Sequence, residues 1–165
     1  MNNNLPLHGE EADIIEADFG ENVYDMVTLS QTFVHFPSTE DAFKVVEKAA
    51  RALKPGGNLY LRTVGKRDSH FLEAEDRYAL PSDEDPNVFY EMCGCSGQPQ
   101  LEAHLFLDEF QLMTQLESQG LQIWHSQVAP ETGSMNVMYG EDWHVPTEPD
   151  TTRAMITLIA QKKPA

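Results

Sequence analysis

The stretch Arg51–Gly65, "RALKPGGNLYLRTVG", carries the signal that decides the fold. Pro55 cannot continue a helix, and Gly56 or Gly57 can adopt the left-handed conformation that closes one. The residues that follow the glycines, NLYLRTV, alternate between polar and apolar as a strand does. The stretch therefore predicts the end of a helix, a short turn and the start of a strand.

The residues before this turn predict an amphipathic helix. Apolar side chains recur at the spacing of one helical face, and charged side chains occupy the opposite face. Ser38 lies three residues before Asp41, which is a typical arrangement at a helix start. The apolar positions are Ala42, Val45, Val46, Ala49, Ala50 and Leu53.

A strand is predicted on the other side of this helix. The segment Tyr24–Phe33 contains Met26, Val27 and Leu29 between polar residues, as a strand buried on both faces of a parallel sheet does. A helix that connects two strands by short turns indicates that the strands are parallel. The sequence therefore predicts an α/β fold.

The residues after the second strand are harder to interpret. Residues 66–100 are acidic and interrupted by Pro81 and Pro86, so we expect a loop or a loosely helical, lid-like insertion. The whole chain has 165 residues, a length that suits a single domain over residues 1–165.

A second helix and two further strands are predicted in the last third of the chain. Asp108 caps a helix that ends at Gly120, and we expect Phe110, Met113 and Leu116 to face inward. The segments 121–129 and 151–165 are strand candidates that can pair in antiparallel fashion.

Composition excludes several classes of function. The sequence has 11 basic and 27 acidic residues, a net charge of −16, which disfavours a nucleic-acid substrate. No apolar stretch approaches a membrane span and no signal peptide is visible, so we expect a cytoplasmic protein. Cys93 and Cys95 are the only cysteines, and even with His104 they fall short of a structural zinc site, so no metal is expected.

Four segments, taken in order, resemble the class I S-adenosylmethionine-dependent methyltransferases. They are "VYDMVTLSQTFVHFP", "RALKPGGNLYL", "AHLFLDEFQLMTQLESQGLQIWHSQ" and "AMITLIAQKK", and the likeness spans about residues 5–163. The third segment resembles the tellurite-resistance type and related small-molecule enzymes. The resemblance implies a Rossmann-like sheet, mostly parallel with an antiparallel terminal strand pair, and S-adenosylmethionine as cofactor.

The chain also departs from this family. It has no glycine-rich turn after a first strand and no acidic residue ending a second strand, so the N-terminal Gly-rich βαβ portion is missing. In the family order 3-2-1-4-5-7-6, residues 24–29 would then form an exposed edge strand, and Leu5–Asp13, the third-strand segment, would have no second strand beside it. An open edge invites pairing, so we expect a homo-oligomer or a complementing chain.

The resemblance also suggests roles for individual residues. An acid after the third strand, either Asp13 or Asp18, would contact adenine; both can equally be acids in a solvated turn. His35 would be a catalytic base; alternatively, it packs or caps. The other candidates for the cofactor are Phe19, Ser30, Gln31 and Thr32, and those for the substrate are Arg62, His70, His104, Tyr139 and Trp143.

Three functions are compatible with these observations. The first is methyl transfer to a small-molecule acceptor, either by this chain alone or together with the missing N-terminal part or a partner chain. The second is a catalytically inactive, methyltransferase-like binding or structural subunit. The third is an unrelated α/β domain that binds another nucleotide, since fold alone does not establish function.

Overall fold

A computed structural model describes residues 9–68, 71, 80–93, 100–130 and 154–164. Its helices and strands, in chain order, are β1 (Tyr24–Ser30), α1 (Thr39–Ala52), β2 (Leu53–Val64), β3 (Leu80–Pro81), β4 (Val88–Cys93), β5 (Gln100–Leu105), α4 (Glu109–Ser118), β6 (Leu121–Pro130) and β7 (Ala154–Lys162). None of the helices in these ranges is long and apolar enough to cross a membrane.

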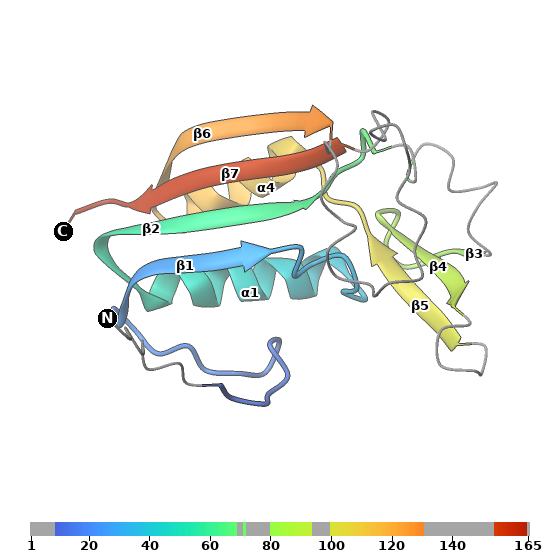
Figure 1. Ribbon diagram of the computed structural model, residues 1–165, viewed down its shortest axis with the longest axis horizontal. Coiled ribbons are helices and arrows are strands. Elements are labelled where there is room, and N and C mark those ends of the chain that lie inside the picture. The colour runs from blue at the N-terminus through green and yellow to red at the C-terminus, as the bar shows by residue number, and fades with distance from the viewer. Residues whose placement is uncertain (1–8, 69–70, 72–79, 94–99, 131–153, 165) are drawn as a thin grey trace, which may run out of the picture.

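The main sheet has four strands in the order β1-β2-β7-β6 (Figure 1). β1 and β2 are parallel, whereas β7 pairs in antiparallel fashion with both β2 and β6. The predicted parallel pair around a crossover helix and the predicted antiparallel terminal pair are confirmed. The expectation of a mostly parallel sheet is wrong, because β7 lies between β2 and β6 and makes both of its pairings antiparallel.

Helix α1 forms where the sequence predicts it. The backbone N–H of Asp41 donates to the Ser38 hydroxyl at 3.1 Å, and that hydroxyl donates to the Asp41 carboxylate at 2.8 Å. The Ser38 hydroxyl, followed by the Lys44 ammonium, lowers the pKa of Asp41. At the other end the helix is capped by Leu53, whose backbone is extended and whose N–H donates to the Ala49 carbonyl. Gly56 has the predicted left-handed conformation, with a φ of 81°, but it lies within β2 and does not close the helix as expected.

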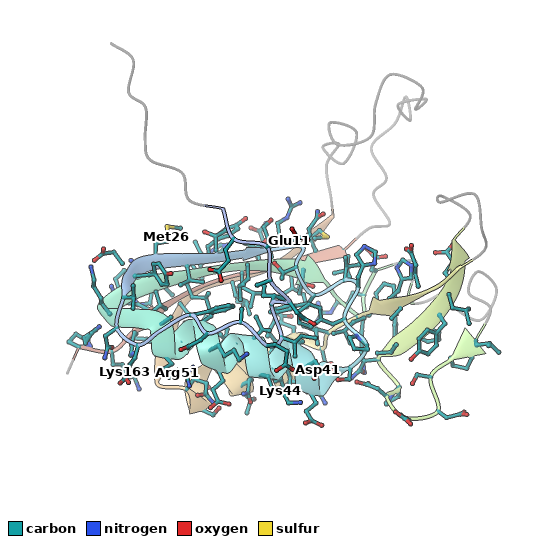
Figure 2. All side chains as sticks on the ribbon, turned by 90° about the horizontal axis from the view of Figure 1, so that it is seen from below. Glu11, Met26, Asp41, Lys44, Arg51 and Lys163 are labelled. Atoms are coloured by element: carbon teal, nitrogen blue, oxygen red, sulfur yellow. The ribbon has the colours of Figure 1, made fainter. Side chains whose placement is uncertain are left out.

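Both helices cover the same face of the main sheet (Figures 1 and 2). The inward side chains of α1 pack against alternate residues of the strands, and these include Leu29, Leu59, Leu61 and Leu158, which are all at most 4% exposed. Each such side chain contributes roughly 2 kcal/mol of hydrophobic free energy to folding. One apolar layer between the sheet and the helices therefore holds the two together.

A second, three-stranded antiparallel sheet follows the order β3-β4-β5. Strands β3 and β4 lie within residues 66–100, so the prediction that this region is a loop or loosely helical is wrong for them. The second sheet is tied to the main body by the backbone N–H of Leu105, which donates to the Val34 carbonyl at 2.9 Å. A lid-like role for residues 66–100 remains a prediction.

The described segment before β1, residues 9–23, contains no strand. The part of the predicted third strand that is described, residues 9–13, is therefore not a strand; residues 5–8 lie outside the described ranges. Instead the segment lies along α1, where the Lys48 ammonium donates to the carbonyls of Ile15 and Ala17.

Strand β1 is an edge strand, as predicted, because among the described strands only β2 pairs with it. The edge is only partly apolar on its surface. Met26 is 59% exposed and points away from the helices (Figure 2), whereas Leu29 is buried beneath the sheet. Within the described ranges no strand pairs with the outer side of β1, and such an edge can take another strand.

Candidate functional site

The parallel strands β1 and β2 end side by side. Ser30 pairs with Arg62 in the ladder, and the next residue, Gln31, donates its backbone N–H to the Arg62 carbonyl at 2.7 Å. Gln31 has a φ of 54°, a left-handed conformation that residues with a side chain adopt uncommonly. The turn brings Ser30, Gln31 and Thr32 to the carboxyl edge of the parallel pair, where open α/β sheets bind ligands.

The loop after this turn presents His35 to solvent. Phe33 and Phe36 on either side of it are buried, and their rings meet edge to face with centroids 5.3 Å apart. The carbonyl of Val34 is held by β5 through the backbone N–H of Leu105. His35 is therefore an exposed side chain on a loop that its neighbours fix in place.

His35 lies beside His104 of β5, with ring centroids 5.5 Å apart. Ligand atoms of His35, Glu102 and His104 all lie within 4.8 Å of one another. Nε2 of His104 lies 3.3 Å from Oε2 of Glu91 on β4. We call these four residues the His–Glu cluster.

The sequence suggested both histidines separately but neither glutamate. Glu91 and Glu102 are directly opposite each other in the β4–β5 ladder, within or next to the region interpreted as a loop. The alternation of "QLEAHL" over residues 100–105 is the signal that would have revealed a strand with Glu102 and His104 on one face. Beside the cluster is an open hollow of about 340 Å³, lined by His35, Glu102 and Ala103.

The basic residues after β2 have partners of their own. Lys66 lies over the ring of Phe71, with its ammonium 5.7 Å from the ring centroid. Arg67 faces Glu109, with 3.9 Å between its guanidinium and the carboxylate. Of the basic residues considered for substrate binding, Arg62 is the one that stands in the strand ladder beside Ser30.

The two acids considered for adenine contact lie in different surroundings. The Asp13 carboxylate accepts the backbone N–H of Ile15 at 2.9 Å. Asp18 accepts the N–H of Gly20 and pairs with Arg51 at 3.2 Å. Because Arg51 is in the last turn of α1, just before β2 begins, Asp18 lies at the end of the sheet opposite to Ser30.

Phe19 is partly buried and packs against the main core. Three of the proposed substrate residues, His70, Tyr139 and Trp143, lie outside the described residues. The side chain of Cys93 and the whole of Cys95 are likewise outside them, so the expectation that the cysteines bind no metal is not tested.

The architecture has counterparts among known proteins. A family model described as "Methyltransferase domain" matches residues 2–61, which include β1, α1 and most of β2. A methyltransferase from Methanosarcina mazei, described as S-adenosylmethionine-dependent, superposes with a TM-score of 0.68 at 19% identity over 93% of this chain and 66% of its own. The fold is that of the S-adenosylmethionine-dependent methyltransferases.

Two further structures with a methyltransferase fold are informative. One is a complex of the Haloferax volcanii Trm112 methyltransferase activator with a methyltransferase (TM-score 0.56, 14% identity, 93% of this chain and 60% of that one). The other is the Burkholderia thailandensis 1,6-didemethyltoxoflavin N1-methyltransferase with S-adenosylhomocysteine bound (TM-score 0.51, 14% identity, 92% and 49%).

The chain spans only about half to two thirds of the length of these three structures. No sequence among the curated proteins matches it.

Proposed function

We propose that the chain takes part in S-adenosylmethionine-dependent methyl transfer to a small-molecule acceptor, in the cytoplasm, and that it is related to the tellurite-resistance type of enzyme. The observation that carries the proposal is the pair of parallel strands that ends in the Gln31 turn. Most of this pair lies within residues 2–61, the part of the chain that matches the methyltransferase domain, and it exposes polar side chains at its carboxyl edge.

The described residues fit part of the cofactor. Ser30, Gln31 and Thr32 offer hydrogen-bonding groups where this fold binds ligands. Asp13 suits the adenine contact better than Asp18, because Asp18 pairs with Arg51 at the far end of the sheet. The sequence has no glycine-rich turn that would let the backbone approach a nucleoside, so that part of the pocket must come from elsewhere.

The cofactor, when bound, supplies a methyl group that its sulfonium makes electrophilic. The protein then needs only to align the acceptor and exclude water. In this proposal His35 accepts a proton from the acceptor, because a neutral imidazole can do so near neutral pH. The side chains proposed to hold the acceptor are Arg62, His70, His104, Tyr139 and Trp143.

The open edge of β1 supports a partner for this function. Either a second copy of the chain or a complementing chain can pair along Tyr24–Ser30 and complete the cofactor pocket. The Trm112 complex offers an analogy, since the methyltransferase in that structure is bound to a separate activator protein.

Calorimetry with S-adenosylhomocysteine tests the proposal on the purified chain. We expect saturable heat, and we expect the variant Q31G to bind roughly tenfold more weakly, as for the loss of one hydrogen bond to the ligand. Glycine keeps the left-handed backbone, so the variant should stay folded. The matched control is S118A on α4, which should bind as the unmodified chain does.

An inactive binding subunit is the second candidate, and the unpaired edge of β1 favours it. Light scattering separates the two functions when it is combined with the calorimetry. A defined oligomer that gives no heat with the ligand would support the subunit and refute methyl transfer by this chain alone. Heat that Q31G leaves unchanged would refute the assigned site.

A further inference from the structure

We propose that the His–Glu cluster is a binding site for a divalent transition-metal ion of the zinc class. The ligands are His35, Glu102 and His104, and Glu91 orients His104. The proposal does not depend on methyl transfer, because it rests on four side chains that meet where the loop after β1 touches the second sheet. It is an alternative to the role of His35 as a base, since an imidazole whose unprotonated nitrogen binds a metal ion cannot also accept a proton.

Three separate elements bring these side chains together. Glu102 and His104 are two residues apart in β5, so both project from the same face of the second sheet. Glu91 lies directly opposite Glu102 in the β4 ladder and so shares that face. The loop after β1 supplies His35, which the bond between Val34 and Leu105 holds against β5.

The donor set suits a borderline metal. Two imidazoles and one carboxylate are a combination that zinc binds with an open fourth position, whereas magnesium and calcium prefer oxygen ligands alone. In a tetrahedral zinc site the ligand atoms lie roughly 3 to 4 Å apart. The corresponding atoms here lie within 4.8 Å of one another, so a small rotation of the exposed His35 closes the site.

The charges of the cluster favour a cation. Two carboxylates opposite each other across a pair of strands repel, and the chain as a whole carries a net charge of −16. A bound dication offsets this repulsion. It also links the loop after β1 to the second sheet, beside the hollow that His35, Glu102 and Ala103 line.

Glu91 is positioned to orient the ring of His104. Its carboxylate lies 3.3 Å from Nε2 of His104, and the His104 side chain is only 18% exposed. Histidines that bind metals commonly donate their second ring N–H to a carboxylate, which fixes the ring and the tautomer. The Glu91 carboxylate is therefore placed to fix the orientation of the His104 ring when a metal binds.

The test uses the whole chain without an affinity tag, first stripped of metal with a chelator. Calorimetry with zinc chloride should give one site per chain, and magnesium chloride should give none. The variants H35Q and H104N should each weaken zinc binding by roughly 10- to 100-fold or more, and E91Q by about tenfold. The matched control is H125Q, since His125 is an exposed histidine on β6, a strand of the main sheet that lies apart from β4 and β5 (Figure 1).

Cobalt provides a second readout that does not depend on affinity. The cobalt-loaded chain should show the intense visible absorption of a tetrahedral site, and H35Q should lose it. Because His35 is exposed, H35Q should keep the melting temperature of the metal-free chain, which separates loss of a ligand from loss of the fold. The proposal is overturned if the chain binds no zinc, or if H35Q and H104N bind it as tightly as H125Q does.

Discussion

Replacing Gly57 by alanine should destabilise the protein more than the same change at the neighbouring Gly56. A Cβ at position 57 would lie 2.9 Å from the Lys54 carbonyl oxygen, 3.1 Å from that of Tyr24 and 3.2 Å from that of Asp25. All three atoms belong to the backbone, so none can rotate away. The two strands can accept the methyl group only if β1 moves away from the start of β2.

The size of the effect follows from these contacts. Overpacking of this kind costs roughly 1 to 3 kcal/mol, and the lower entropy of the unfolded chain returns about 0.4 to 1 kcal/mol. We therefore expect G57A to lose about 1.3 kcal/mol, equivalent to a fall of roughly 3 to 5 °C in Tm. A Cβ added at Gly56 would have no atom within 4 Å, so the only cost of G56A is that alanine must adopt the left-handed conformation. The net loss of stability should be roughly 0.5 to 1 kcal/mol.

Urea unfolding followed by circular dichroism measures both variants against the unmodified chain. The slope of the transition should stay the same, while its midpoint should fall further in G57A than in G56A. Equal losses, or a larger loss in G56A, would refute the close approach of β1 and β2 at this turn. The pairing that brings Ser30 beside Arg62 would then be in doubt as well.

Three further changes test other parts of the structure. S38A removes the cap of α1 and should lower the free energy of unfolding by about 1 kcal/mol, measured by urea unfolding. The Ser38 hydroxyl also lowers the pKa of Asp41 below its ordinary 3.8, so this stabilisation is present above that pH and is lost as the pH falls below it. The stability of S38A should therefore fall less steeply in acid than that of the unmodified chain. D85N should cost roughly 1.5 to 3 kcal/mol in the same assay, because the Asp85 carboxylate accepts the Thr39 N–H at 2.6 Å at the start of α1; no change would exclude that contact. M26K should leave Tm within the equivalent of about 0.5 kcal/mol but reduce self-association in light scattering, since Met26 is exposed on the edge strand; an unchanged oligomer would rule out that edge as the interface.

Local signals predicted the β1–α1–β2 unit correctly. Ser38 fixes where α1 begins, and the apolar spacing of α1 identifies its buried face, whereas the helix ends at Ala52, before the proline and glycines that were expected to close it. The start of α4 at Asp108 was predicted in the same way, but its buried face was partly wrong. Phe110 is 68% exposed because it lies two residues, or about 200° around the helix, from the buried Leu112.

Non-local pairing accounts for what the sequence did not predict. β4 and β5 are short and carry charged residues, so their stability depends on each other and on the burial of Val88 and Leu105 against the main body. The direction of β7 relative to β2 is likewise set by which strands become neighbours. The candidate sites show the same difference between local and non-local signals. The position of Ser30 at the end of a strand could be predicted from that strand alone, whereas the contact between His35 and His104 depends on how the two sheets pack together.

The place of β7 in the sheet affects the order in which the protein can assemble during synthesis. β1, α1 and β2 emerge first from the ribosome and can associate at once, whereas β6 emerges before β7, its partner among the strands that the structure describes. Until β7 inserts between them, β2 and β6 each have an open side. Because chaperones bind such unpaired apolar strands in nascent chains, the interval before Ala154–Lys162 emerges should be the one in which this chain most needs that protection.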